Sequence, residues 1–253
     1  MARQGWDTAA ALLALALAGC GDDSGTGNAA GQGGGGGEGG GGTIAPAAYY
    51  EGPESAALGA AGNEARCSTC HSDDGAEGYS GNTFMDLAFH DSFKGGEADL
   101  LGAVNACVTG WMGGAALTSD DEAFIALRTF MEGISDPGAT TSNPIAPEVL
   151  ADEAAYGAAY DGGDAVAGEA KYATYCARCH GGGLVVGPMA APDTATLGAL
   201  SIGRIAQQVR TSGPPPSGMN DATDSTPGPM PFFEPSELPA SDLADIVAFL
   251  TGG

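Results

Sequence analysis

Basic side chains are scarce in this sequence. Its 253 residues include 8 Lys and Arg against 32 Asp and Glu, which gives a formal net charge of −24. Nucleic-acid binding requires clustered Lys and Arg to neutralise phosphates, and the few basic residues here are scattered along the chain. The composition therefore excludes nucleic acid as a partner and indicates an acidic surface, which favours encounter with basic partners.

Aromatic and charged residues are also few. They make up 7% and 16% of the chain, whereas glycine alone contributes 44 residues. Side chains of this kind make only a thin core in a domain of fewer than about 100 residues. A buried apolar cofactor would supply the missing volume.

The amino-terminal apolar run, Ala9 to Ala18, is too short to cross a bilayer, which takes roughly 18–20 residues. It is typical of an export signal. Residues 17–20, Leu-Ala-Gly-Cys, resemble the lipobox of bacterial lipoproteins, in which cleavage before the cysteine leaves that residue carrying diacylglycerol. The resemblance implies a signal peptide over 1–19 and two acyl chains on Cys20, enough for stable membrane attachment. The alternative is an ordinary secretory signal that happens to precede a cysteine.

Residues 20–50 follow as lipid anchor and linker. Glycine dominates them and no apolar periodicity appears, so we expect a disordered tether with an end-to-end distance on the order of 30 Å. The residue after the anchor is Gly21 and not Asp, which resembles an inner-membrane retention signal in some Gram-negative bacteria. We therefore expect the periplasmic side of the bacterial cell envelope, with the outer membrane favoured over the inner one.

Four of the six cysteines lie in two copies of one motif, C-x-x-C-H. The copies are Cys67-Ser-Thr-Cys70-His71 and Cys176-Ala-Arg-Cys179-His180, which begin 109 residues apart. At helical spacing the two thiols share one face and can each form a thioether to a haem vinyl group, while the histidine points its imidazole at the iron. The motifs predict two haem c groups, each held by both cysteines of its motif and coordinated by its histidine.

Zinc binding and disulfide formation are the rival interpretations of the C-x-x-C pairs. Two pairs could form a four-thiolate zinc site, but their separation and the attached histidines argue against it. A disulfide within each pair would leave the histidines unexplained. Haem attachment explains all six residues together.

The second half of the chain, from about residue 161 to 253, resembles the class I cytochrome c family. It has the family's order of a helix over 168–176 that ends in the motif, a Gly187-Pro188 segment, a methionine loop and a packing helix. The resemblance implies that a carbonyl of Gly187-Pro188 orients the imidazole of His180.

The resemblance also implies that Met230, in the loop Gly-Pro-Met-Pro-Phe, is the sixth ligand of the second haem. Met219 and Met189 are the alternatives.

An amphipathic helix is predicted at the carboxyl end. Ser241 is a good N-cap, and apolar residues recur at helical spacing at Leu243, Ile246, Val247 and Leu250. We expect Phe249 to cross the first helix of this domain near Gly168.

The first half, from about residue 53 to 133, matches the same family more loosely. We expect a helix over 55–67, a helix over 97–108, and a helix over 123–132 opened by a Ser119–Glu122 capping box. No Gly-Pro follows His71, so the residue that orients its imidazole is left open.

The resemblance favours Met112, in a glycine-rich stretch just before the last helix, as the sixth ligand of the first haem. Met85, His90 and Met131 also follow the first motif and remain alternatives. Cys107 is left over; we interpret it as a small buried apolar residue, with an intermolecular disulfide or a reactive thiol as the alternatives.

The chain is therefore predicted to be all-α, with two small cytochrome c-like domains, each around one covalently bound haem, after a disordered tether. The domains are a signal peptide over 1–19, the anchor and linker over 20–50, the first cytochrome domain over 51–135, a linker over 136–160 and the second cytochrome domain over 161–253.

Iron with His and Met ligands has a filled coordination shell, so it exchanges electrons without binding a substrate. We predict a carrier of single electrons and not an enzyme, with basic redox proteins or a dehydrogenase or oxidase complex as partners. The rival hypothesis is a peroxidase-like di-haem enzyme or a haem sensor with one open iron.

Overall fold

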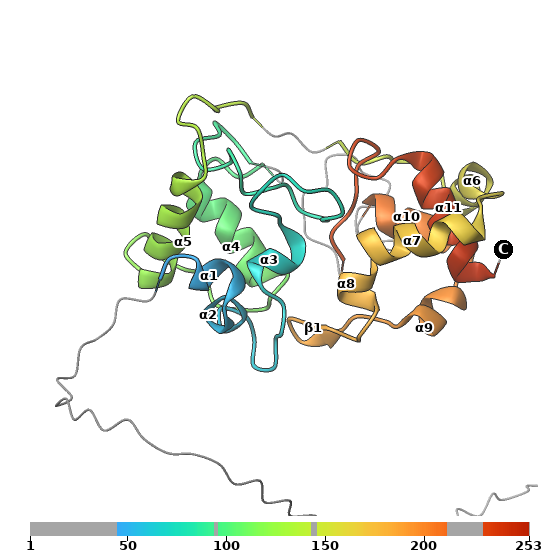
Figure 1. Cartoon of the computed structure of the whole chain (residues 1–253), viewed down its shortest axis with the longest axis horizontal. Coiled ribbons are helices and arrows are strands. Elements are labelled where there is room, and N and C mark those ends of the chain that lie inside the picture. The colour runs from blue at the N-terminus through green and yellow to red at the C-terminus, as the bar shows by residue number, and fades with distance from the viewer. Residues whose placement is uncertain (1–44, 94–95, 143–145, 212–229, 253) are drawn as a thin grey trace, which may run out of the picture. The chain divides into compact units, whose positions relative to one another are not determined.

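The computed structural model describes residues 45–93, 96–142, 146–211 and 230–252 (Figure 1). These residues are mostly helical. Within them, no helix has both the length and the apolar character needed to cross a membrane. The carboxyl-terminal half also contains one antiparallel pair of short strands, in which Val185 pairs with Ala190 and Val186 with Met189.

The elements follow one another as α1 (Ala48–Glu51), α2 (Pro53–Ala56), α3 (Cys67–Cys70), α4 (Leu100–Gly110), α5 (Glu122–Gly133), α6 (Glu153–Tyr160), α7 (Ala165–Tyr175), α8 (Ala177–His180), β1 (Val185–Val186), β2 (Met189–Ala190), α9 (Thr194–Gly198), α10 (Ile202–Thr211) and α11 (Ala240–Thr251).

The helix crossing expected in the second half is present. Helices α7 and α11 pack so closely that a Cβ placed on Gly168 would lie 2.0 Å from the carbonyl oxygen of Asp245 and 2.8 Å from the Cβ of Phe249. The rings of Tyr172 and Phe249 are in contact, with their centroids 5.4 Å apart. Only glycine at position 168 allows this approach.

An ion cluster supports the same crossing. The Nζ of Lys171 lies 2.6 Å from Oδ1 of Asp242 and 2.5 Å from Oδ2 of Asp245. The other oxygen of Asp245 accepts a hydrogen bond from the amide of Asp164, the N-cap residue of α7, at 2.7 Å. Hydrogen bonding to Lys171 and to Asp164 therefore lowers the pKa of Asp245.

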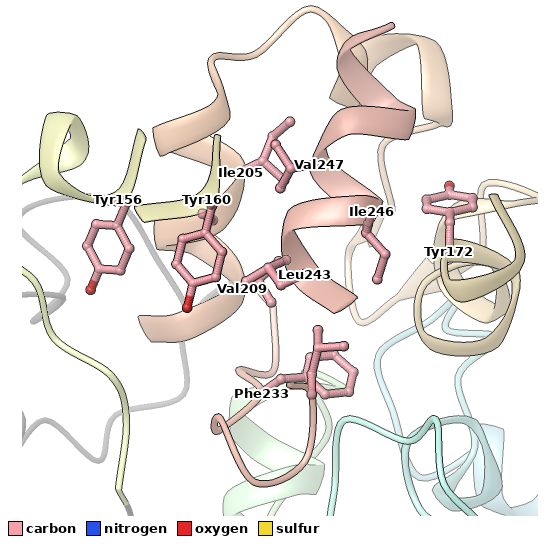
Figure 2. Close-up of a cluster of buried hydrophobic side chains, with 11 residues drawn as sticks. Tyr156, Tyr160, Tyr172, Ile205, Val209, Phe233, Leu243, Ile246 and Val247 are labelled. Carbon is pink, nitrogen blue, oxygen red and sulfur yellow. The ribbon is translucent and has the colours of Figure 1, made fainter. Parts of the chain in front are cut away.

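The second-half core joins four helices (Figure 2). Tyr156 and Tyr160 of α6 enter it beside Ile205 and Val209 of α10. Both tyrosines are fully buried, because the i, i+4 spacing places them on one face of α6. Residues 153–160, which the sequence analysis assigned to the end of a linker, are thus a helix packed into this core.

The first-half core lies among α1, α4 and α5. Its buried residues are Tyr49, Tyr50, Phe84, Val104, Val108, Met112, Phe124, Ala126, Leu127 and Met131. The helix expected over 97–108 is α4, which begins only at Leu100 because the side chain of Asp99 caps it by accepting from the amide of Gly102 at 2.7 Å.

Three local predictions were wrong. The helix expected over 55–67 ends at Ala56, because Gly62 has φ +89 and the Asn63 side chain donates to the carbonyls of Ala56 and Ala65. The chain between α2 and α3 is therefore a turn held by that amide.

The other two errors concern helix starts. No Ser119–Glu122 capping box forms: α5 begins at Glu122, since the carboxylate of Asp121 accepts from the amide of Thr118 at 2.5 Å and holds the preceding residues in a turn. Ser241 is not the N-cap of α11, because Pro239 occupies that position and the helix already starts at Ala240.

Substituting Gly168→Ala is expected to destabilise the protein by about 1–3 kcal/mol, the usual cost of overpacking, because the new methyl group would overlap the backbone of α11. Chemical denaturation measures the change. Gly133→Ala is the matched control, since a Cβ there meets nothing within 4 Å. Equal losses in the two variants would contradict the proposed close crossing.

Candidate haem sites

A cavity of about 430 Å³ lies in the first half. Its wall contains both cysteines and the histidine of the first motif, Cys67, Cys70 and His71. Met112 lines the same cavity. The remaining wall is largely apolar and includes Phe84, Leu87, Leu100, Val104, Val108 and Leu127. The structure therefore brings together both thiols, the histidine and the predicted sixth ligand around one apolar space.

The His71 ring is held from one side. Its Nδ1 lies 2.6 Å from the carbonyl oxygen of Asn82. A carbonyl can only accept, so Nδ1 carries the proton and Nε2 has the lone pair that a metal ligand needs. A Cβ on Gly81 would lie 2.4 Å from the imidazole, so only glycine lets the loop come this close.

Asn82 is a positioning residue that sequence reasoning missed. The contact comes from a backbone carbonyl, which any residue type could supply, so no side-chain pattern could have indicated it. The absence of Gly-Pro after His71 left this question open, and the carbonyl of Asn82 answers it. Phe84 packs on the imidazole as well, with ring centroids 4.6 Å apart.

The thiols of the first motif lie in apolar surroundings. Burial raises the pKa of Cys70 to about 12, and the nearby Cys179 thiol of the second motif adds to this effect. Burial also raises the pKa of Cys67, whose sulfur accepts from the hydroxyl of Ser55 at 3.3 Å. Both thiols are therefore neutral near pH 7.

The candidates for the sixth ligand of the first haem differ in whether they line the cavity. Met112 is 6% exposed. Its amide donates to the carbonyl of Cys107 at 3.1 Å, and its carbonyl accepts from the amide of Ala60 at 2.7 Å, so its backbone is fixed on both sides. Met131 also lines the cavity, from α5. Met85 is 39% exposed and does not line the cavity.

His90 does not line this cavity either. Its ring lies beside Phe93, with centroids 6.3 Å apart, and its Nδ1 is buried with no hydrogen-bond partner among the described residues. The arrangement favours Met112 and Met131 over His90 and Met85.

Cys107 lines the first cavity from α4. Its side chain is half-buried, and burial raises the pKa of its thiol to about 12. Because Cys107 lines the cavity, its half-buried side chain would contact an apolar group bound there. This fits its interpretation as a small apolar residue.

In the second half, Cys176 follows the last residue of α7, and Cys179 and His180 lie on α8. The Nδ1 of His180 lies 2.8 Å from the carbonyl oxygen of Pro192. The prediction that a carbonyl of Gly187-Pro188 takes this contact was wrong. Gly187 lies in the turn between β1 and β2, where its amide donates to Oδ1 of Asn63 in the first half at 2.9 Å.

Met230 packs partly buried against the second-half core, as do Cys176 and Ala177 of the motif. Met189 is 64% exposed on β2. Met219 lies outside the described residues. Of the described methionines considered for this site, Met230 is the one placed beside the core that the motif also contacts.

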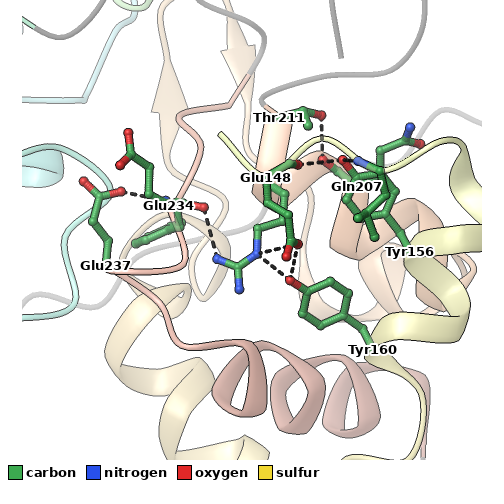
Figure 3. Close-up of polar contacts among 10 residues, drawn as sticks. Glu148, Tyr156, Tyr160, Gln207, Thr211, Glu234 and Glu237 are labelled. Atoms are coloured by element: carbon green, nitrogen blue, oxygen red, sulfur yellow. Dashed lines mark hydrogen bonds and ion pairs between the residues drawn. The ribbon is translucent and has the colours of Figure 1, made fainter. Parts of the chain in front are cut away.

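A fully buried arginine, Arg210, lies at the end of α10 beside this core. Figure 3 shows two of its neighbours, the Tyr160 hydroxyl and the Glu148 carboxylate, which form a hydrogen bond. Nε of Arg210 donates to the hydroxyl of Tyr160 at 2.8 Å and lies 3.5 Å from Oε2 of Glu148, which also accepts from the Tyr160 hydroxyl. Its Nη1 donates to the carbonyl of Phe233 at 3.1 Å. Its Nη2 finds no acceptor among the residues that the structure describes.

The residues of the first site fit a haem, and the second site carries the same motif. The first supplies an apolar cavity with two thiols, an oriented imidazole and a thioether sulfur. The second supplies the same motif, and the spare N–H of a buried guanidinium suits a carboxylate such as a haem propionate. In the described part of the chain, His, Cys, Asp and Glu form no cluster of three or more that could bind a metal ion directly.

The comparisons with known proteins agree for the second half. Residues 163–250 match the family described as cytochrome C oxidase, cbb3-type, subunit III. No curated protein matches the chain. The matched segment contains the second motif and Met230, and it supports a c-type cytochrome with covalently bound haem c.

Substituting Arg210→Met should lower the free energy of unfolding by about 1–3 kcal/mol, because Glu148 and the Tyr160 hydroxyl lose their cationic partner. Chemical denaturation of the haem-loaded protein measures the loss. Tyr160→Phe removes a single hydroxyl and should cost about 1 kcal/mol. A smaller loss for the arginine variant than for the tyrosine variant would contradict this ranking.

Proposed function

We propose that this protein is a membrane-anchored di-haem c-type cytochrome that passes single electrons between redox partners in the cell envelope. The observation that carries the proposal is the first-half cavity, where one complete C-x-x-C-H motif and Met112 face a common apolar space. The family match over 163–250 independently supports haem c in the second half.

A haem iron between His and Met exchanges one electron at a time without binding a substrate. The chain's own residues supply the conditions for that chemistry. The Asn82 carbonyl fixes the His71 tautomer, as the Pro192 carbonyl does for His180. The wall of the first cavity is largely apolar, which lowers its affinity for water.

The two sites lie near one another. The Cys179 thiol is close enough to the Cys70 thiol to raise its pKa, after burial as the larger cause. The guanidinium of Arg178 stacks 3.6 Å from the centre of the Tyr79 ring, and its Nη1 donates to the carbonyl of Ser68 at 3.4 Å. This contact between the motifs supports electron passage from one haem to the other.

The anchor and the location are part of the proposal. Residues 17–20 carry the lipobox resemblance, and the cbb3-type family match suggests an envelope or periplasmic location. The net charge of −24 supports basic redox proteins, or a basic face of a dehydrogenase or oxidase complex, as partners.

The coordination of the irons tests the carrier function. The pyridine haemochrome assay should give two haems per chain, and reduced wild-type protein should bind no carbon monoxide, because both sixth positions are filled. Met112→Ala should open the first iron, so that one equivalent of carbon monoxide binds per chain.

Met85→Ala is the matched control, since Met85 lies outside the cavity wall and should leave carbon monoxide binding unchanged. Carbon monoxide binding to half the haem of the wild-type protein would instead favour the enzyme or sensor.

The anchor has its own test. Cells expressing the full chain should incorporate labelled palmitate into the protein and retain it in the membrane fraction, because two acyl chains give stable attachment. Cys20→Ala should abolish both signals. Membrane retention of the unlabelled Cys20→Ala protein would contradict the lipid anchor.

A further inference from the structure

The turn between β1 and β2 belongs to the second half of the sequence but is bound by residues of the first half. The amide of Gly187 donates to Oδ1 of Asn63 at 2.9 Å, and this bond is buried. The carbonyl of Val185 accepts from the amides of Glu64 and Ala65 at 2.8 and 3.2 Å. The Val185 amide donates to Oε2 of Glu64 at 3.0 Å.

Asn63 connects this turn to the first-half fold. Its side chain is 9% exposed, and its Nδ2 donates to the carbonyls of Ala56 and Ala65, both at 2.9 Å. All the principal hydrogen-bonding groups of the amide are therefore used. One buried side chain fixes both the turn before the first motif and the turn after the second.

The seated turn rests directly on the segment that carries Met112. A Cβ on Gly187 would lie 2.6 Å from the carbonyl oxygen of Trp111 and 3.3 Å from the carbonyl carbon of Met112. Pro188 contacts the next residue, since a Cβ on Gly113 would lie 3.4 Å from its Cδ. The turn therefore packs against the backbone of Met112 and limits its movement.

The second half also completes the wall of the first cavity. Val186, from β1, lines it together with Pro231 and Phe232. The last two directly follow Met230, the proposed sixth ligand of the second haem. One short stretch therefore contacts the second-half core through Met230 and the first cavity through the next two residues.

We propose that the β1–β2 turn of the second cytochrome domain is a positioning element for the first haem site: seated on Trp111 and Met112, it keeps the sulfur of Met112 at the iron. This inference rests on the proposed di-haem function. It makes Gly187 and Asn63 positioning residues for the ligand of the first iron, although neither contacts the side chain of a haem ligand. The first iron then stays six-coordinate only while the second domain is seated.

Gly187→Ala tests this proposal, because its methyl group would press on the Trp111 carbonyl and displace Met112. Reduced protein carrying two haems should then bind about one equivalent of carbon monoxide per chain, and the oxidised protein should lose the methionine-to-iron charge-transfer absorption of one haem. Adding Met112→Ala to Gly187→Ala should give no further binding, because both changes open the same iron.

Gly183→Ala is the matched control. Gly183 also has a left-handed backbone, φ +69 against +58, but a Cβ there meets nothing within 4 Å. It carries the same kind of backbone strain without contact to the first half. Gly183→Ala should therefore bind no carbon monoxide, and equal binding in the two variants would overturn the proposal.

A second variant, Glu64→Ala, tests the proposal if the Gly187→Ala protein does not fold. Glu64→Ala removes the acceptor of the Val185 amide without adding atoms, and reduced protein carrying this change should bind up to one equivalent of carbon monoxide per chain, where the wild type binds none. A two-haem protein with Gly187→Ala or Glu64→Ala that binds no carbon monoxide overturns the positioning role. Failure of the proposed function looks different, since the wild-type protein would then lack a second haem or would itself bind carbon monoxide.

Discussion

The first half of this protein is built around a space that its own side chains do not fill. Protein interiors are close-packed, and voids larger than a water molecule are few. Most of the residues that line this cavity of about 430 Å³ are apolar, so without a bound group their surfaces would lack packing partners. A large apolar group bound in this space would supply the contacts that the side chains leave unmade.

The features that could be predicted from the sequence are those with a local cause. The C-x-x-C-H motifs fix covalent chemistry within five residues, so their meaning does not depend on distant parts of the chain. The amphipathic pattern of α11 is similarly local, and Leu243, Ile246 and Val247 are buried as expected. The small residue at position 168 predicted the contact with Phe249 because the family resemblance supplied the partner helix.

Two of the failed predictions have a long-range cause. The end of α2 and the turn after it depend on the amide of Asn63, whose third partner, Gly187, is 124 residues away. The same contact removes Gly187-Pro188 from the imidazole of His180 and leaves that role to the Pro192 carbonyl. Backbone carbonyls carry no side-chain signature, so sequence patterns cannot say which of them faces a histidine.

The fold also determines what remains on the surface. At least five of the six described basic side chains have fixed partners within the chain. They are Arg66 on the Glu51 carbonyl, Arg128 beside Glu132, Lys171 with Asp242 and Asp245, Arg178 on Tyr79, and the buried Arg210.

Most of the described positive charge is therefore paired within the chain, and Arg128, whose side chain is 44% exposed, pairs with Glu132 at the surface. In the whole sequence the 32 acidic residues outnumber the 8 Lys and Arg residues fourfold, and their field extends over the distances at which protein partners first meet. Coulombic steering acts on the rate of encounter more than on the strength of a complex. An electron carrier benefits from that combination, since a partner that arrives quickly and leaves quickly allows the next transfer.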